Sequence, residues 1–379
     1  MERRKEHAKW IPFDLTREIL LRLPAKSLMR FRCVSKLWAS VTSDQDFINS
    51  FTTQSPIQRS CLILNLQKND KKLFFSVSQH NNPEKYLLTL QKKKCYKSCF
   101  QIQSVHGLIS FHYLHDIVIW NPTMRQYVTF PKPYKRKLTI SYLGYDTIGN
   151  TYKLLSKSCS RTDEAYVLTL GTKESSWRKI KSIPTRYLPC KGICINGVLF
   201  YIVSDGFRIK IMSFDVRTEK FKLIQTHSCM HDDLTSKLSL VSYKGKLAWV
   251  ILESCFYKLW VLEDAKNEEW SCKDFHLPFS PKDPIVKVNY FLSGVTNDGE
   301  FIYVSVSLQD KKIYVSYYDP KRNSNKRIKI ERFEDEEFWL RNGCRDDGEF
   351  IGSLPNHIEN LMSLKSIACS PSASFFRAF

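Results

Sequence analysis

Two β-rich runs joined by a polar turn recur through most of the chain. The turn positions fall every 44 to 55 residues, at Asn121, Gly171, Asp215, Asp264 and Asp319. Val, Ile, Phe, Tyr and Trp fill the runs, and Gly, Asn, Asp and Pro interrupt them, as is typical of short strands. About four strands in every 45 to 50 residues is typical of a β-propeller blade. The repeat therefore favours an all-β domain built as a propeller.

Each copy of the repeat is preceded by a predicted hairpin. Asn196-Gly197 and Asp298-Gly299 lie in two of these hairpins and are strong signals for a tight turn. The less regular stretch 61–90 can supply one more blade, so we expect about six blades. A pair of stacked antiparallel sheets is the alternative, because Gly-Gly and Trp-Asp blade signatures are missing. We expect the recurring tryptophans to fill the space between blades: Trp177, Trp249, Trp260 and Trp270.

The stretch from Trp10 to Trp38 differs from the rest because its apolar residues follow a helical period. One predicted helix carries a single apolar stripe of Leu15, Ile19, Leu20 and Leu23. Pro24 ends this helix, since proline lacks the amide donor and clashes with the preceding turn. A second apolar cluster follows, and Ser35 is a predicted N-cap for a third helix. We therefore expect three short helices.

This helical segment is too small for the apolar residues that it carries. Fewer than about 40 residues rarely bury a self-sufficient core, so part of the apolar surface must contact something else. These residues either dock on the rest of the chain or form a surface for a partner, since an exposed apolar patch usually marks an interaction site. The pattern alone leaves both interpretations open.

Residues 10–38 resemble an F-box. The runs that carry the resemblance are Ile11-Pro-Phe-Asp-Leu, Glu18-Ile-Leu, Arg22-Leu-Pro, Lys26-Ser-Leu, Arg30-Phe-Arg-Cys-Val-Ser-Lys and Trp38. The sequence is most similar to a large plant family in which the F-box is followed by an F-box associated, kelch-like domain. Asp44-Gln-Asp-Phe and Ser50-Phe51 resemble that family's exit from the F-box, although Gln45 stands where the family usually has proline.

The resemblance implies an α+β multidomain protein that binds the Skp-type adaptor of a cullin–RING ubiquitin ligase and recruits a protein substrate. The implied parts are an F-box at 8–51, a connector at 52–60, an F-box associated β-domain at 61–333, and an irregular closing segment and tail at 334–379. We expect residues 370–379 to be frayed. The residues that form or support the adaptor-facing surface would be Pro12, Leu15, Ile19, Leu20, Leu28, Cys33, Val34 and Trp38.

The chain is basic, with 58 Lys and Arg against 38 Asp and Glu and a formal net charge of +20. Such a surface could attract nucleic acid, an anionic membrane or an acidic protein. The basic residues are scattered in short clusters, however, and we interpret most of them as solvated loop charge. A nucleic-acid-binding module and a kelch-like ligand-binding module, both without a ligase role, remain the alternatives.

The sequence shows no signal for secretion or for membrane insertion. No apolar run follows the charged N-terminus, and no stretch approaches the roughly 18–20 apolar residues of a membrane span. We expect a nuclear or cytoplasmic location, where thiols stay reduced. Most of the 12 cysteines are then small core residues.

Signatures of catalysis and of metal binding are weak or missing. The sequence contains no Gly-x-Ser-x-Gly, His-Glu-x-x-His or phosphate-binding loop. His227-Ser-Cys-Met-His231 is the only tight Cys/His cluster, and the spaced pairs Cys95/Cys99 and Cys190/Cys194 lack adjacent histidines. We expect no cofactor, no metal and no enzymatic activity. On the β-domain, Arg186-Tyr187 and Phe207-Arg208 are candidate substrate contacts, because Arg and aromatic residues dominate binding hot spots.

Overall fold

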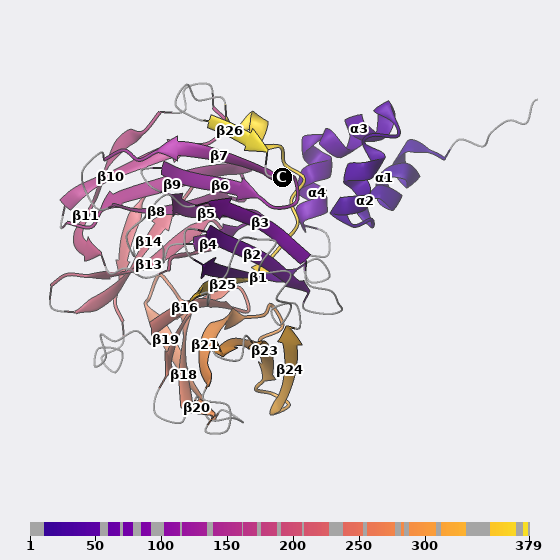
Figure 1. The fold of residues 1–379 in the computed structure, drawn as a ribbon. Helices are drawn as coiled ribbons and strands as arrows, with labels where there is room; N and C mark the ends of the chain where they lie inside the picture. The colour runs from indigo at the N-terminus through magenta and orange to yellow at the C-terminus, as the bar shows by residue number, and fades with distance from the viewer. Residues whose placement is uncertain are drawn as a thin grey trace, which may run out of the picture.

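The computed structural model describes most of the chain. The described residues are 11–53, 60–68, 71–78, 85–91, 102–113, 116–134, 139–160, 162–172, 176–187, 191–206, 208–226, 238–252, 256–276, 282–283, 288–307, 312–330, 349–368 and 374–377. Within these ranges the chain begins with helices and continues as an all-β domain, and the helices lie to one side of the strands (Figure 1).

The N-terminal unit contains four helices: α1 (Phe13–Leu21), α2 (Ala25–Phe31), α3 (Lys36–Ser43) and α4 (Gln45–Thr53). The Ser35 side chain accepts a hydrogen bond from the Trp38 amide at 3.5 Å, which confirms the predicted cap of α3. Asp44 Oδ1 accepts the amides of Asp46 and Phe47 at 3.0 and 3.1 Å and begins α4 in the same way. The sequence predicted three helices. The fourth extends through Thr53, into the stretch that was expected to be a connector.

The strands of the described part of the chain form five hydrogen-bonded sheets, and one of them contains two successive groups of strands, so we describe six antiparallel groups. The first three groups are β1 (Cys61–Lys68), β2 (Lys71–Ser78) and β3 (Lys85–Gln91); β4 (Ile102–Val105), β5 (Leu108–Tyr113), β6 (Asp116–Asn121) and β7 (Gln126–Pro131); and β8 (Thr139–Asp146), β9 (Thr151–Ser158), β10 (Thr162–Thr169) and β11 (Arg178–Tyr187).

The next three groups have the same antiparallel order. They are β12 (Ile193–Ile195), β13 (Val198–Ser204), β14 (Ile209–Asp215) and β15 (Phe221–Ile224); β16 (Leu238–Tyr243), β17 (Lys246–Leu252), β18 (Phe256–Asp264) and β19 (Glu269–His276); and β20 (Lys282–Asp283), β21 (Val288–Val295), β22 (Phe301–Ser307), β23 (Lys312–Asp319) and β24 (Ser324–Ile330).

One strand at or next to the edge of each group contacts its counterpart in the next group. In order these strands are β25 (Glu349–His357), β4, β8, β12, β16 and β21, and β21 contacts β25 again, so the strands surround a common axis. This is the arrangement of a β-propeller. β11 also pairs with β13, Arg186 opposite Ser204, which joins two groups into one eight-stranded sheet. The number of about six blades therefore stays a prediction.

The C-terminal part contains more regular structure than the sequence suggested. β25 pairs with β1, with His357 opposite Cys61, so the two ends of the β-domain share one sheet. η3 (Leu364–Ser366) and β26 (Ser374–Arg377) follow. β26 pairs with the edge strand β7, and the expectation of a frayed tail is wrong for these four residues. An edge strand offers unpaired amides and carbonyls, which a distant segment can fill without a local sequence signal.

The core of the β-domain lies between neighbouring groups of strands. Trp249 and Trp260 pack with isoleucines of β12, β13 and β14, and Trp270 packs against the same cluster. Trp177 packs on a cluster shared by the second and third groups. These positions confirm that the recurring tryptophans fill the space between groups.

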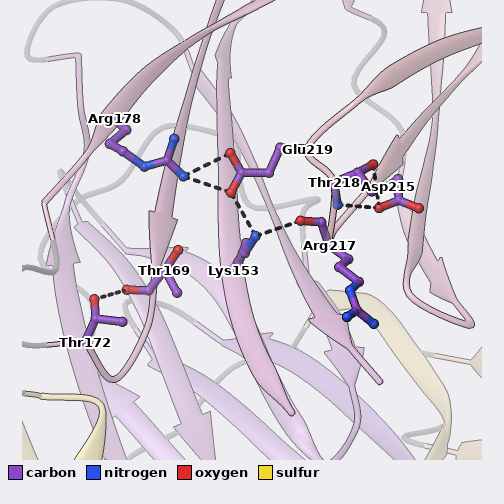
Figure 2. Close-up of polar contacts among 8 residues, drawn as sticks. All are labelled: Lys153, Thr169, Thr172, Arg178, Asp215, Arg217, Thr218 and Glu219. Atoms are coloured by element: carbon purple, nitrogen blue, oxygen red, sulfur yellow. Dashed lines mark hydrogen bonds and ion pairs between the residues drawn. The ribbon is translucent and has the colours of Figure 1, made fainter. Parts of the chain in front are cut away.

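A polar contact also joins the third and fourth groups (Figure 2). Glu219, in the β14–β15 turn, accepts hydrogen bonds from Lys153 Nζ of β9 and from Arg178 Nη2 of β11, each at 2.8 Å. Burial acts to raise the pKa of the Glu219 carboxyl, but the hydrogen bonds from Lys153 and Arg178 outweigh it and hold this pKa below its usual value. Glu219 is thus a charged link between groups.

Candidate partner-docking surface on the helical unit

Large apolar side chains are exposed at the start of the chain. Of nine such side chains in the described residues, six lie between residues 11 and 37, with exposed fractions between 49% and 74%. We call these six the apolar face: Ile11, Phe13, Leu15, Ile19, Val34 and Leu37. Leu15 and Ile19 are four residues apart on α1 and share one side of that helix. A concentration of exposed apolar residues of this kind is typical of an interaction site.

The structure divides the eight predicted surface residues into two sets. Five are exposed and one is half-buried, in this order: Pro12, Leu15, Ile19, Cys33, Val34 and Trp38. Leu20 and Leu28 are instead buried, with 2% and 0% of their surface exposed. These two leucines can support the apolar face from below but cannot form it in the free protein. The apolar face also contains Ile11, Phe13 and Leu37, which the prediction did not name, although two of them lie in the runs that resemble an F-box.

The buried side of the helices forms a core that two distant residues complete, the buried Leu361 and the half-buried Met362. Its members from the helices are Leu20, Leu21, Ala25, Leu28, Val41, Phe47, Ile48 and Phe51. Leu361, fully buried, belongs to the same cluster. The structure therefore distributes the apolar residues between two sides of the unit. One side docks on the rest of the chain, as one interpretation predicted. The apolar face is exposed, and its use as a partner surface stays a prediction.

Leu361 lies in a segment that we call the C-terminal strap, residues 358–363 between β25 and η3. Figure 1 shows this segment, in yellow, running beside α4 and the ends of the strands. The Ala25 amide donates to Glu359 Oε2 at 3.1 Å, which ties the strap to the start of α2. The strap therefore lies between the helical unit and the β-domain and contacts both.

Asn360 fastens the strap to the β-domain. Its side-chain amide donates to the His106 carbonyl at 2.7 Å and to Tyr152 Oη at 3.0 Å, and its backbone carbonyl accepts a hydrogen bond from Asn121 Nδ2 at 3.0 Å. Gly107, with a φ of 82°, allows this approach, because a Cβ there would lie 2.5 Å from the Asn360 Cβ. The Asn360 side-chain oxygen accepts a hydrogen bond from the Met362 amide at 2.7 Å, so every polar group of this buried side chain has a partner. These hydrogen bonds fix the position of the strap on the β-domain.

Two histidines, the half-buried His106 and the buried His357, lie near the strap. Desolvation lowers the pKa of both His106 and His357 to about 4. His106 stacks on Tyr145 with ring centroids 3.9 Å apart, and His357 Nδ1 lies 2.8 Å from Ser104 Oγ. Both imidazoles are neutral near pH 7.

The candidate substrate contacts lie at neighbouring strand ends. Arg186 is exposed at the end of β11, opposite Ser204, and Arg208 is exposed in the turn that follows Ser204. The Arg208 amide donates to Asp205 Oδ1 at 2.9 Å within that turn. The structure thus brings Arg186 and Arg208 to one end of the third and fourth groups. Phe207 lies outside the described residues.

The described residues contain no group of three or more His, Cys, Asp or Glu side chains that could hold a metal ion. The cluster at 227–231, the pair at 95 and 99, and Cys190 lie outside the described ranges. None of the helices in those ranges is long and apolar enough to cross a membrane.

A helical unit with an exposed apolar face, held on a ring-shaped β-domain, defines a two-part interaction protein. Residues 10–50 match the model of the F-box domain, and residues 61–358 match that of the F-box associated beta propeller domain. The chain therefore belongs to the plant F-box proteins with a C-terminal F-box associated β-propeller domain. The resemblance found in the sequence and the propeller fold are both confirmed.

Several curated relatives are similar over nearly their whole length. The putative F-box protein At4g21240 of Arabidopsis thaliana is 40% identical, over 94% of this chain and 90% of the relative. The putative F-box protein At1g47790 of the same plant is 39% identical, over 93% of this chain and 94% of the relative. The F-box protein At5g18160 is 37% identical, over 93% and 91%.

Proposed function

We propose that this chain is the substrate-recognition subunit of an SCF-type (Skp–cullin–F-box) E3 ubiquitin ligase. In this proposal the helical unit binds the Skp-type adaptor, and through it the cullin and RING subunits. The β-domain recruits a protein substrate for ubiquitination. The observation that carries the proposal is the apolar face, which is exposed on a unit whose other side is already buried on the strap.

The apolar face is large enough for a stable complex. Full burial of a large apolar side chain contributes roughly 1.5–3 kcal/mol. The summed free energy of burying several such side chains exceeds the entropic and desolvation costs of association. The chain itself then supplies no chemistry. It raises the effective concentration of a substrate lysine near the ubiquitin-conjugating enzyme that carries the ubiquitin. We also propose a nuclear or cytoplasmic location, which is consistent with the free cysteines found at all five described cysteine positions.

Adaptor binding by full-length variants tests this proposal. Ile19→Asp places a charge on the apolar face and should weaken binding to purified Skp-type adaptor by about 2 kcal/mol or more, roughly 30-fold. Ile148→Asp is the matched control, because Ile148 is 71% exposed in the β8–β9 turn of the β-domain. Binding should be measured by calorimetry, with thermal unfolding of both variants alongside. Failure of the unaltered chain to bind the adaptor, or equal binding by all three proteins, would remove the ligase proposal.

A further inference from the structure

Lys191 reaches across the axis of the β-domain. It precedes β12 in the fourth group, and its Nζ lies 3.2 Å from the backbone carbonyl oxygen of Ser353 in β25. In the order of strands around the axis, β12 and β25 are three steps apart in either direction. The two strands are therefore opposite one another, and the side chain crosses between them.

Neighbouring backbone holds Lys191 in this position. The next residue, Gly192, accepts a hydrogen bond on its carbonyl from Gln103 Nε2 at 2.8 Å. A Cβ on Gly192 would lie 2.6 Å from the Tyr142 ring, so the chain approaches the third group too closely for any other residue. At the far end, Gly352 has no side chain, and its Cβ position is 3.4 Å from Lys191 Nζ. The ammonium thus lies over bare backbone.

The positive charge of Lys191 has no carboxylate partner in the described part of the chain. Other lysines there form ion pairs, including Lys153, Lys210 and Lys246. An ammonium group has three N–H donors, and the described residues offer it one acceptor, the Ser353 carbonyl. Two donors remain for another group.

The Lys191 ammonium is enclosed by protein and yet accessible. Desolvation lowers its pKa to about 8, while the residue is exposed to solvent. Both observations hold for a side chain that protein surrounds on several sides without covering it. Near neutral pH the side chain is still mainly a cation, and a dissolved group can reach it.

We propose that Lys191 anchors an anion site at the axis of the β-domain, which takes one carboxylate or phosphate group. The attraction between the ammonium and this group is strengthened by the surrounding protein, because enclosure lowers the local dielectric. The inference rests on the proposed function where it concerns the substrate. If the β-domain recruits a substrate, the group is an acidic or phosphorylated side chain or the carboxylate at a chain end.

Calorimetric titration of the full-length protein with inorganic phosphate, and separately with acetate, tests the site. Lys191→Met should weaken binding at least ten-fold, and Lys191→Arg should retain it. Lys222→Met is the matched control. Lys222 is exposed, and its Nζ also donates to backbone carbonyls, those of Ala265 at 2.6 Å and Lys266 at 3.2 Å. Equal binding by all variants, or no binding by the unaltered protein, would overturn the proposal.

A second measurement needs no variant and covers a failure of Lys191→Met to fold. Acetic anhydride acylates accessible lysines, and peptide mass spectrometry reports each position. Phosphate should slow acylation at Lys191 and leave Lys222 unchanged. An unchanged acylation rate at Lys191 in saturating phosphate would contradict the site.

Peptides then distinguish the two sources of the anion. A peptide with a phosphoserine or a free terminal carboxylate, compared with its neutral counterpart, should displace phosphate if the group comes from a substrate. Displacement by free anions alone would support a small-molecule ligand at the same site. Adaptor binding should be unaffected by Lys191→Met in both cases. Failure of the unaltered chain to bind the adaptor would overturn the ligase role but would not affect the proposal of an anion site.

Discussion

The backbone amide of Ala25 donates a hydrogen bond to the carboxylate of Glu359, 3.1 Å away, across 334 residues of sequence. Ala25 is the first residue of α2, and the preceding Pro24 provides no side-chain cap. The first amides of a helix have no partner within the helix, and a negative charge there is favourable. A residue of the C-terminal strap therefore caps a helix of the F-box. The structure of the F-box thus includes contacts from the C-terminal strap as well as its own residues.

The first prediction concerns Leu361. Leu361→Ala should destabilise the helical unit by about 2–5 kcal/mol, because it leaves a cavity in a core that the helices cannot close alone. The measurement is chemical unfolding followed by helical circular dichroism. Phe376→Ala is the control, since Phe376 is in the same C-terminal region but is 44% exposed. If helical unfolding is unchanged in Leu361→Ala, the strap does not complete this core.

The second prediction separates the core of the F-box from its apolar face. Leu28→Ala should lower the free energy of unfolding of the helical unit by about 2–5 kcal/mol, because Leu28 is fully buried. Val34→Ala should change it by less than about 0.5 kcal/mol, because Val34 is 74% exposed, but should weaken adaptor binding. Calorimetry with the adaptor and unfolding of both variants check this. Loss of stability in Val34→Ala, or weakened adaptor binding in Leu28→Ala without loss of stability, would contradict this division between core and apolar face.

The third prediction concerns Glu219 and the contact in Figure 2. Glu219→Gln should destabilise the β-domain by about 1–2 kcal/mol, an intermediate value between those of exposed and buried ion pairs. The lowered pKa of Glu219 means that its stabilising contribution is present above about pH 4.5, the usual value for a glutamate, and is lost as pH falls below it. The effect of the substitution, measured by urea unfolding, should therefore shrink in acid.

Glu263→Gln is the matched control for Glu219→Gln. Glu263 forms an ion pair with Lys246 that is exposed on both sides, so its loss should change stability little. Equal effects of the two substitutions would contradict the view that Glu219 links two groups of strands.

The fourth prediction concerns pH and the buried His357. The pKa of His357 is about 4 in the folded chain, against about 6.5 for an unperturbed histidine. Between these values the unfolded chain binds more protons, so stability is complete above pH 6.5 and falls toward pH 4, by up to about 3 kcal/mol for one histidine. His357→Gln should flatten this part of the stability curve, measured by urea unfolding between pH 7 and 4. An unchanged slope would show that the pKa of His357 is not lowered in the folded chain.

Local patterns in the sequence were enough for the two-part organisation. The helical period around Leu15 and Ile19 predicted short helices, the resemblance of residues 10–38 to a known family predicted the F-box, and turns at regular spacing predicted a propeller. These features are local, because helices and hairpins are formed by residues close in sequence. The same stripe also contained Leu20, and the period could not tell which side of the helix faces a partner and which faces the core.

Only the tertiary structure decided what the C-terminal residues do. β25 pairs with β1, and Leu361 packs in the core of the F-box. Asn360 forms hydrogen bonds with Asn121, His106 and Tyr152 of the β-domain. Each of these contacts joins residues more than 200 positions apart, and no local period or turn signal records such a pairing. Lys191 is a similar case, because its position in the sequence does not predict a contact with residues 352 and 353. Only the closed ring of strands places its ammonium beside the backbone of Gly352 and Ser353.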